Sequence, residues 1–188
     1  MTRIIAGSAG GRRIKTPTGD STRPTSDRVR EALFSAIESE LGSVSGLRFL
    51  DAYAGSGAVA LEARSRGAGV VTLVEHDRRT AALIRDNARS LGFDGVDVVV
   101  QPVVRAFAHP PRAPYDIAFL DPPYALPVAD VEAALQDLRD HGWLGPGALV
   151  VVERSSRGPA LTWPVGIEGE RTKSYGETVL WYGHAANP

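Results

Sequence analysis

The sequence predicts an α/β domain built on a mostly parallel sheet of about seven strands, with an antiparallel strand at one edge. Two observations indicate this fold class. Between residues 47 and 154, short apolar runs alternate with amphipathic segments, as in parallel sheets covered by helices on both faces. Residues 167–183 instead predict two strands joined by a turn near residues 174–176, which indicates an antiparallel pair.

The N-terminal part predicts a short β-hairpin followed by a helix. The runs RIIAG and GRRIKTP are separated by Gly and Ser, and Pro and Gly residues mark the loop behind them. Val29, Leu33, Ile37 and Leu41 then recur every four residues, which predicts an amphipathic helix over 26–41. Thr25 or Ser26 would cap it and Gly42 would end it. We therefore expect a hairpin arm over 1–24 and a second domain over 25–188.

The remaining elements follow in regular alternation. Strands are predicted at 47–53, 70–75, 96–101, 115–123 and 147–154. Helices are predicted at 57–67, 77–92 and 127–142, the last with Pro127 in its first turn. We find no internal repeat and no low-complexity segment in the sequence.

Composition indicates a globular protein. The chain has 188 residues, of which 43% are hydrophobic and 23% charged. No apolar run approaches the roughly 20 residues of a membrane span, and the N-terminus lacks the features of a signal peptide, so we expect a cytoplasmic location and no membrane partner. The absence of cysteine excludes thiolate ligands, and the four histidines are far apart in the sequence. No metal is therefore expected.

Charge is distributed unevenly along the chain. Residues 1–30 contain seven basic and two acidic residues, a net charge of +5, whereas the whole chain has a net charge of −1. The remainder therefore carries −6. A basic segment on an acidic body is typical of a polyanion-binding arm. A solvated tail would have the same composition, and charge alone does not separate the two.

A glycine-rich loop follows the first strand of the alternating region. Gly55 and Gly57 stand between Asp51 and a predicted helix. Glycines here allow a sharp turn and a close approach of a ligand to the main chain, beside the free N–H groups of a helix N-terminus. The pattern predicts a nucleotide-type site, although it also satisfies the relaxed dinucleotide fingerprint. Glycines that serve only a tight turn are the simpler alternative.

Glu75 closes the second strand, 18 residues beyond Gly57. An acidic group at this position can accept hydrogen bonds from both hydroxyls of a ribose. An exposed carboxylate at a strand end is the structural alternative. Together the loop and Glu75 predict an adenosine-like ligand, but they do not say whether it donates a hydride or a methyl group.

The run IAFLDPPYAL, residues 117–126, decides between these chemistries. A buried strand ends there in Asp121-Pro122-Pro123-Tyr124, at the same sheet edge as the glycine loop. Two prolines make the turn rigid, so that the Asp121 carboxylate and the Pro122 carbonyl can accept both hydrogens of an exocyclic amine. The Tyr124 ring can stack on the base that carries the amine.

Such acceptors suit methylation of an amine. A conjugated amine is a poor nucleophile because its lone pair is delocalised into the ring. Two fixed acceptors localise that pair as the nitrogen becomes tetrahedral, so the interaction strengthens toward the transition state. Transfer of an electrophilic sulfonium methyl then depends mostly on positioning. Hydride transfer has no need of this arrangement.

The sequence also resembles a known family. The stretches that carry the broad likeness are FLDAYAGSGAVALEARSRGA, VEHD and FLDPPY, which resemble S-adenosylmethionine-dependent methyltransferases of the Rossmann-like class I that modify nucleobase amines. The stretches RIIAGSAGGRRIKTP, TRPTSDRVREALFSAI and RTKSYGETVLWY are similar to the bacterial 16S rRNA guanine-N2 methyltransferases, the RsmD-like family. The likeness spans nearly the whole chain. It implies a cytoplasmic enzyme, active as a monomer, on the guanine at position 966 of 16S rRNA, within the small ribosomal subunit or its assembly intermediate.

The resemblance implies roles for individual residues. Asp121, Pro122 and Tyr124 would be catalytic. The cofactor S-adenosylmethionine would be bound by Asp51, Tyr53, Gly55, Ser56, Gly57, Glu75, His76 and Gln101. Many relatives have an acidic or small polar residue near Gln101 that meets the adenine amine, and the Gln101 amide oxygen would take its place. The substrate would be bound by Arg12, Arg13, Arg23, Pro24, Thr25 and Arg28.

Alternative functions stay open at this point. The Asp-Pro-Pro-Tyr motif is shared with adenine-N6 and cytosine-N4 DNA enzymes, so the chain could methylate DNA or transfer RNA, although 188 residues leave little room for a target-recognition domain. A non-catalytic RNA-binding or dehydrogenase-like module would have no need of Asp121. Arg154 and Lys173 would lie on an RNA-facing surface or a merely solvated one, and Tyr175, Trp181 and Tyr182 are expected to pack at the sheet edge.

Overall fold

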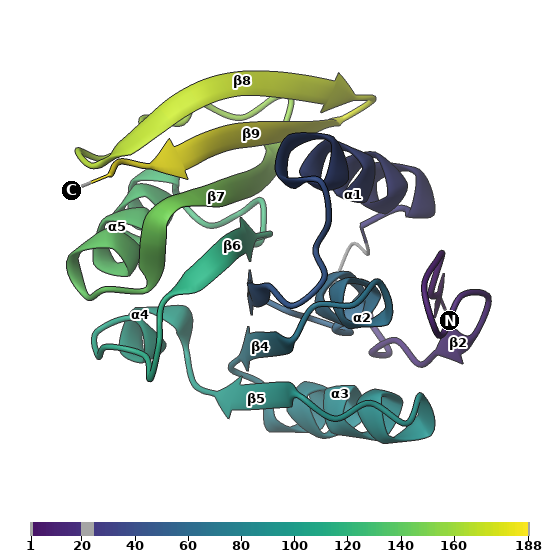
Figure 1. The fold of residues 1–188 in the computed structure, drawn as a ribbon. Coiled ribbons are helices and arrows are strands. Elements are labelled where there is room, and N and C mark those ends of the chain that lie inside the picture. The colour runs from purple at the N-terminus through teal and green to yellow at the C-terminus, as the bar shows by residue number, and fades with distance from the viewer. Residues whose placement is uncertain (1, 20–24, 188) are drawn as a thin grey trace.

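The computed structural model describes residues 2–19 and 25–187, which form a seven-stranded sheet with helices on both faces (Figure 1). The strand order is β5-β4-β3-β6-β7-β9-β8, and β1 and β2 form a separate pair. The strands are β1 (Thr2–Arg3), β2 (Arg13–Ile14), β3 (Arg48–Ala52), β4 (Val70–Glu75), β5 (Val96–Val100), β6 (Tyr115–Leu120), β7 (Leu144–Ser155), β8 (Ile167–Tyr175) and β9 (Thr178–Ala185). The helices are α1 (Asp27–Leu41), α2 (Ala58–Ser65), α3 (Arg78–Ser90), α4 (Val103–Ala106) and α5 (Val128–Asp140).

Strand direction confirms the predicted fold class. The neighbours β5, β4, β3, β6 and β7 run parallel to one another. β9 runs antiparallel to both β7 and β8, which closes the sheet with an antiparallel edge. The predicted N-terminal hairpin is present as the β1–β2 pair. Because the central strands are parallel, their carboxyl ends all meet at one edge of the sheet.

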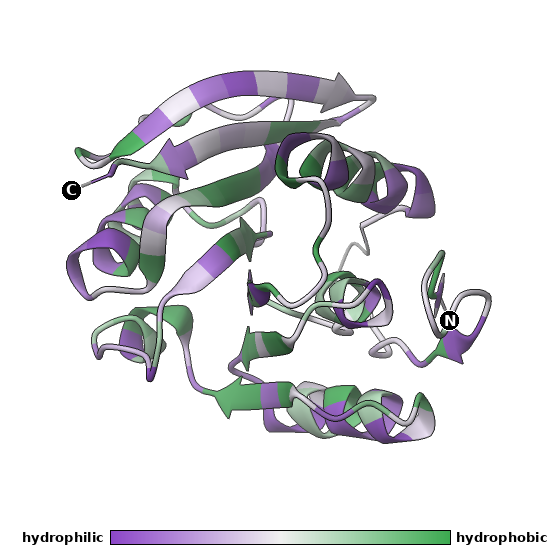
Figure 2. Ribbon diagram, viewed as in Figure 1, coloured by the Kyte–Doolittle hydropathy of each residue, from purple (hydrophilic) through white to green (hydrophobic). Residues whose placement is uncertain are grey.

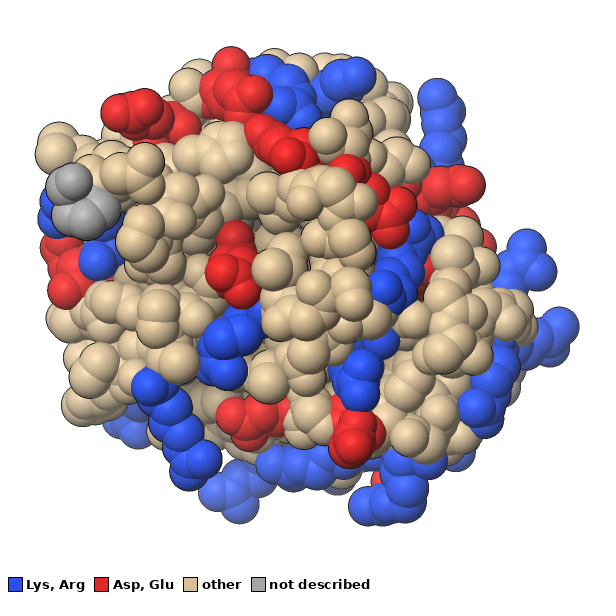
Figure 3. All heavy atoms as spheres, in the orientation of Figure 1, with Lys and Arg blue, Asp and Glu red and all other residues tan. Residues whose placement is uncertain are grey.

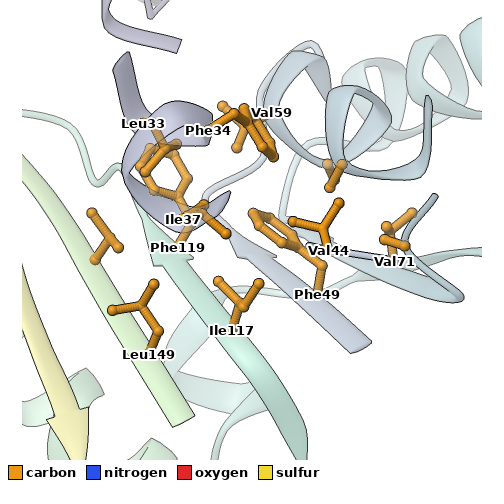
Figure 4. Close-up of a cluster of buried hydrophobic side chains, with 14 of the residues drawn as sticks. Leu33, Phe34, Ile37, Val44, Phe49, Val59, Val71, Ile117, Phe119 and Leu149 are labelled. Atoms are coloured by element: carbon orange, nitrogen blue, oxygen red, sulfur yellow. The ribbon is translucent and has the colours of Figure 1, made fainter. Parts of the chain in front are cut away.

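Helices cover the two faces in separate groups. Phe49 and Ile117 pack with residues of α1, α2 and α3 in one core cluster (Figure 4), whereas Leu50 and Ala118 pack with α4 and α5 in another. In Figure 1 the first helix group lies to the right of the sheet and the second to the left. Successive strand residues point to opposite faces. The central strands therefore need apolar residues at nearly every position, which explains their continuous hydrophobic runs.

The edge strand has a different character. Figure 2 shows hydrophobic residues concentrated on the inner strands, while β8 is mostly hydrophilic. Of the nine residues of β8, Ile167 is buried, Arg171 and Tyr175 are half-buried and the other six are exposed, so polar groups dominate its outer surface. Charged residues on an outer strand discourage pairing with another chain.

Helix α1 forms as the periodicity predicts. Its N-cap is Ser26, whose hydroxyl accepts a hydrogen bond from the Val29 N–H over 3.2 Å. Val29, Leu33 and Ile37 are buried, and the helix ends at Gly42, where φ is 80°. A positive φ at that position suits glycine.

Some elements differ from their predicted bounds. Strand β7 begins at Leu144, before the predicted residue 147, because it continues outward past the buried segment. Helix α5 begins after Pro127, which occupies the N-cap position and not the first turn. The four-residue helix α4 has no counterpart among the predicted elements, since so short a segment shows no helical periodicity.

The helices were compared with the length and apolar character of a membrane span. Among residues 2–19 and 25–187, none of the helices has both the length and the apolar character needed to cross a bilayer.

The N-terminal hairpin packs on the backs of α2 and α3. Ile4 and Ile14 are buried in a small apolar cluster with Leu61 of α2 and Leu91 at the end of α3. The hairpin therefore rests on the domain through an apolar contact of its own, separate from the two clusters that flank the sheet.

A buried carboxylate fixes the hairpin to α2. Glu62 accepts hydrogen bonds from the backbone N–H of Ile5 over 2.8 Å and of Ala6 over 3.0 Å. It also pairs with Arg66 over 2.9 Å and lies 3.7 Å from Arg30 of α1. The Glu62 side chain is fully buried, so its charge depends on these partners.

Substitution of this carboxylate should loosen the hairpin. We expect Glu62→Gln to lower the free energy of unfolding by about 3 to 5 kcal/mol, because it leaves two arginines without their buried partner. Urea unfolding measures the loss, and hydrogen exchange should show the amides of Ile5 and Ala6 deprotected first. Glu38→Gln is the matched control, since Glu38 pairs with the same Arg66 but is 42% exposed, and it should cost less than about 1 kcal/mol. Equal losses in the two variants would contradict this account.

Candidate functional site

A crevice of about 1000 Å³ lies at the carboxyl edge of the parallel strands. The loops after β3, β4, β5 and β6 contribute to its walls, as do Thr16, Pro17 and Gly19 behind the hairpin and residues of α5. Ligand crevices in open parallel sheets form at this edge, at the point where the chain turns from building one side of the sheet to building the other. Here β3 lies between β4 and β6, which places the crevice at that point.

Four carboxylates from four neighbouring strands line this crevice. Glu75 ends β4, Asp51 lies in β3, Asp121 follows β6 and Glu153 lies in β7. Sheet register explains why Asp121 and Glu153 are adjacent, because Leu120 pairs with Val152 and the next residues are Asp121 and Glu153. The parallel arrangement therefore gathers negative charge at one place.

The pKa values of two of these carboxyl groups are raised. Burial raises the pKa of Asp51 well above its usual range, and the charges of Asp121 and Glu75 raise it further, against a hydrogen bond from the Ala60 N–H. Burial also raises the pKa of Asp121, with the charge of Glu153 as the next cause. Thr25 and Arg154 act in the opposite direction on Asp121. Perturbed carboxyl groups in a crevice are typical of functional sites.

The glycine loop turns sharply between β3 and α2. Gly55 and Gly57 have φ of 57° and 81°, and Tyr53 has φ of 60°, which is uncommon for a residue with a side chain. A Cβ at Gly57 would lie 3.1 Å from Leu73 and 3.3 Å from Ile84, so packing as well as conformation requires glycine. At Gly55 a Cβ would meet nothing within 4 Å, which leaves the main chain open to a ligand.

Two carboxylates hold the loop in place. The Glu75 Oε2 atom accepts from the Gly55 N–H over 3.0 Å, and its Oε1 atom accepts from the Asp77 N–H over 3.0 Å. The Asp51 Oδ2 atom accepts from the Ala60 N–H in the first turn of α2 over 3.1 Å. Burial raises the pKa of Tyr53 to about 12. The hydrogen bonds to Glu75 and Asp51 therefore fix the conformation of the loop before any ligand binds.

The Asp121-Pro122-Pro123-Tyr124 turn opens onto the same crevice. The Asp121 Oδ2 atom accepts a hydrogen bond from the Thr25 hydroxyl over 3.2 Å. The Tyr124 hydroxyl lies 3.2 Å from the Thr178 hydroxyl at the start of β9. Within the described part of the chain, no hydrogen bond reaches the Pro122 carbonyl oxygen. That oxygen is available to a donor on a ligand.

Arg154 supports this turn from inside the protein. The prediction of a surface position for Arg154 is wrong. Its side chain is buried, and its guanidinium donates to the carbonyl of Pro123 over 3.2 Å and of Leu126 over 2.9 Å. The planar guanidinium can reach two carbonyls at once because its donors form a rigid fork. Arg154 therefore fixes the loop that carries Tyr124. Lys173 is exposed on β8.

Most of the predicted ligand-binding residues come together in the crevice. The lining includes Thr25, Asp51, Tyr53, Gly55, Ser56, Glu75, His76, Gln101, Asp121, Pro122 and Tyr124. His76 is exposed, with its Nδ1 atom 3.4 Å from Glu75, and Gln101 is exposed at the end of β5. Gly57 lies beneath the loop and caps α2.

Three predicted substrate-binding arginines, Arg12, Arg13 and Arg28, are not among the residues that line the crevice. Arg12 and Arg13 are exposed on the hairpin, and Arg28 is exposed on α1. The Arg12 guanidinium donates to the carbonyls of Ser90 and Leu91 at the end of α3, so it also ties the hairpin down. The predictions for Arg23 and Pro24 fall outside the described residues.

Sequence reasoning missed Glu153 and the inward direction of Arg154. The signal was present in the run ALVVVER, where an otherwise apolar strand ends in two charged residues. Charged residues at that point of a buried parallel strand lie at the ligand edge. The sequence alone gives Glu153 no role and favours a surface position for Arg154, because the depth of the strand end is not visible in the sequence.

Another group of ionisable side chains lies away from the crevice. His184 of β9 lies 3.1 Å from Glu40 of α1 and 3.2 Å from Glu170 of β8. The three could supply ligand atoms to a metal ion, but Arg171 already lies 3.7 Å from Glu40. Mutual ion pairing between α1 and the edge strands accounts for their proximity.

Comparisons with known proteins agree on one family. The family model described as "Conserved hypothetical protein 95" matches residues 2–184. A protein of Escherichia coli strain K12, "Ribosomal RNA small subunit methyltransferase D", is 35% identical over 175 residues, which cover 93% of this chain and 85% of that protein. The solved structure titled "Putative methyltransferase yhhF from Escherichia coli" is 33% identical, with a TM-score of 0.86 and coverage of 100% of this chain and 99% of that one.

A more distant solved structure shares the fold. It is titled "Crystal structure of SMU.776, a putative methyltransferase complexed with SAH", with 16% identity, a TM-score of 0.67 and coverage of 84% of this chain and 48% of that one. At this identity the likeness is one of fold alone.

Removal of the buried acid Asp51 should stabilise the protein. The pKa of Asp51 is higher in the folded state than in the unfolded state. Ionisation of Asp51 therefore begins to oppose folding as the pH rises past the unfolded-state pKa, and the full loss of stability is reached above the folded-state pKa. We expect Asp51→Asn to raise the free energy of unfolding at neutral pH by roughly 1 kcal/mol or more, because one pKa unit equals about 1.4 kcal/mol. The gain should shrink as the pH falls through the raised pKa. Urea unfolding across pH measures it, with exposed Asp97→Asn as a control expected to change little.

Loss of the guanidinium fork should loosen the loop after β6. In Arg154→Lys a compact ammonium replaces the planar fork whose two nitrogens reach separate carbonyls, so one of the carbonyls of Pro123 and Leu126 loses its charged partner. Since a hydrogen bond to a charged group contributes about 1.5 to 3 kcal/mol, the Leu126 amide should exchange with deuterium at least about tenfold faster. Amides in the middle of β7 should keep their protection. The control is Arg157→Lys, whose ion pair with Glu177 is at the surface, and an unchanged Leu126 amide in Arg154→Lys would refute the role.

Proposed function

Because the chain belongs to the family described as conserved hypothetical protein 95, we propose that it is an S-adenosylmethionine-dependent methyltransferase that acts on RNA of the small ribosomal subunit. We further propose the exocyclic N2 amine of a guanine as the acceptor, at the position called 966 in 16S rRNA. The substrate would be this RNA within the small subunit or within an assembly intermediate, and the enzyme would act as a monomer.

The observation that carries the proposal is the placement of two loops in one crevice. The glycine loop after β3 and the Asp121-to-Tyr124 turn after β6 face the same space, on adjacent strands. The first suits an adenosine-type ligand and the second suits a base amine. An amine and a methyl donor held side by side in this way need mainly positioning to react.

The residues of the crevice fit the proposed cofactor. Gly55 leaves the main chain open, and Glu75 is held by the N–H groups of Gly55 and Asp77 with its carboxylate directed at the crevice. In this role Glu75 would bind the ribose, Asp51 and the glycine loop the methionine end, and Gln101 the adenine. Once bound, the cofactor would supply a methyl group on a positively charged sulfur, and a crevice rich in carboxylates suits that charge.

The acceptor side of the site is rigid. The Asp121 carboxylate and the Pro122 carbonyl would accept the two amine hydrogens, and the Tyr124 ring would stack on the base. Arg154 and Thr178 fix this turn through Pro123, Leu126 and the Tyr124 hydroxyl. Preorganised acceptors that strengthen toward the transition state accelerate the chemical step.

A basic surface lies beside the crevice and would bind RNA phosphates. Figure 3 shows lysines and arginines along the lower and right margins of the molecule, over α3 and the hairpin. They include the exposed residues Arg12, Arg13, Lys15, Arg78, Arg79, Arg85 and Arg89. We propose that residues 1–24 act as an RNA-binding arm and that 25–188 form the catalytic domain. Binding should then weaken as salt rises.

The test is methyl transfer to small subunits from cells that lack this protein. We expect the wild-type enzyme to move a labelled methyl group from S-adenosylmethionine to N2 of one guanine, mapped by mass spectrometry of nuclease fragments. Asp121→Ala should lower the rate at least about 100-fold, because it removes a fixed acceptor. Asp116→Asn is the control, since Asp116 is exposed on the same strand β6.

Three outcomes would contradict the proposal. Label on adenine or cytosine of DNA or transfer RNA would favour the alternative amino-methyltransferase. Binding of a nicotinamide dinucleotide with no binding of S-adenosylmethionine would favour a dehydrogenase-like module. Full activity of Asp121→Ala would refute the proposed mechanism.

A further inference from the structure

Glu153 is a buried carboxylate at the centre of the crevice that the proposed mechanism does not use. It is 5% exposed and lies in β7 beside the Asp121 position of the neighbouring strand. The Thr25 hydroxyl oxygen lies 3.2 Å from Asp121 Oδ2 and 3.2 Å from Glu153 Oε2. The single hydroxyl hydrogen of Thr25 can be donated to only one of the two at a time, so the two carboxyl groups share this donor.

The closeness of these two carboxyl groups affects the protonation of each. Two carboxylates buried side by side repel each other, and the repulsion is stronger where water is excluded. Packing of an apolar residue at position 153 would avoid that repulsion, as at Val150, Val151 and Val152 before it. A second acid next to an amine-binding acid is typical of sites that move a proton.

We propose that Glu153, which lies beside Asp121 and shares the Thr25 hydroxyl with it, is a positioning residue whose charge fits Asp121 to accept the proton released by the guanine amine as it is methylated. This inference rests on the proposed function. It assigns Asp121 a second role, since the same carboxylate first accepts a hydrogen bond from the amine and then takes the hydrogen itself.

The charges and atoms balance in this step. The nitrogen lone pair forms the new N–C bond while the S–C bond breaks and its electron pair stays on sulfur, which becomes neutral. The nitrogen gains a positive charge and loses it with the proton, which moves to the Asp121 carboxylate. Asp121 becomes a neutral carboxylic acid and later gives its proton to water. No further reactant is needed.

The neighbouring charges set the direction of the effect. Glu153 raises the pKa of Asp121, after burial, whereas the Thr25 hydroxyl and Arg154 lower it. Other charged groups facing the same crevice are Arg30 of α1, Asp51 of β3, Glu75 and His76 after β4, and Asp130 and Asp137 of α5. Substitutions at positions 25 and 153 leave all of these in place, so their effects can be compared directly.

A purely structural role predicts something different. If Glu153 only holds the Thr25 segment against the sheet, then Glu153→Gln and Thr25→Val should both loosen that segment and lower activity in the same way at every pH. If Glu153 tunes Asp121, the two substitutions should displace the pH dependence in opposite directions, because they remove opposite influences on the same group.

The experiment is a single-turnover pH profile of methyl transfer to guanine in small subunits. In Glu153→Gln the acidic limb should move to lower pH, and the plateau rate should fall at least about tenfold because Asp121 is a weaker base. In Thr25→Val the acidic limb should move to higher pH. Glu168→Gln, an exposed substitution on β8, should match the wild-type profile. Thermal unfolding shows that each variant is folded. Its affinity for S-adenosylhomocysteine (SAH) shows that the cofactor site is intact.

A second measurement separates failure of this inference from failure of the proposed function. The carboxyl carbon of Asp121, labelled with ¹³C and assigned by its loss in Asp121→Asn, can be titrated by NMR in the SAH complex without any RNA. The titration should shift down in Glu153→Gln and up in Thr25→Val. Shifts in the same direction, or none, would overturn the inference even where guanine is methylated. A wild-type enzyme that does not methylate guanine would instead contradict the proposed function, while the titration still decides whether Glu153 tunes Asp121.

Discussion

The arrangement of the site depends on one constraint, the meeting of parallel strand ends at a single edge of the sheet. β4, β3, β6 and β7 are neighbours, and each places a carboxylate near its carboxyl end, with Asp51 two residues deeper in the sheet than Glu75 and Asp121. No side chain has to be brought from a distant loop, since the backbone register that pairs Leu120 with Val152 also aligns Asp121 and Glu153. The sheet is held rigid by two apolar layers, and this rigidity keeps mutually repelling acids together when each would be more stable in water.

Basic groups play two separate roles in this molecule. Arg30, Arg66 and Arg154 are buried or nearly so, and they satisfy carboxylates or carbonyls inside the protein. Their work is structural, because they hold the hairpin and the loop after β6. The arginines over α3 and the hairpin are exposed to solvent. Arg12 combines the roles, as it binds carbonyls at the end of α3 from an exposed position.

Much of this organisation is predictable from the sequence because it has local causes. The glycine loop, Glu75 and the Asp121 turn each follow a continuous apolar run, so their strand ends and hence their shared edge can be inferred. Ser26 and Gly42 bound α1 through local capping. Other features depend on tertiary contacts that leave no periodic signal. The direction of Arg154, the link from Thr25 to Glu153 and the packing of Ile4 and Ile14 on α2 and α3 arise between residues that are distant in the chain.

The four carboxylates also act as a filter on what can enter. A dinucleotide would bring its pyrophosphate, with two negative charges, against Asp51 and Glu75, which would repel it. In the proposed reaction the RNA would meet the same barrier, since its phosphates would be attracted by the hairpin and α3 but repelled at the crevice. The nucleotide would then enter by its uncharged base, with the sugar-phosphate chain left on the basic rim. The crevice would therefore select ligands by the charge of the group that enters it, before any hydrogen bond to the base is formed.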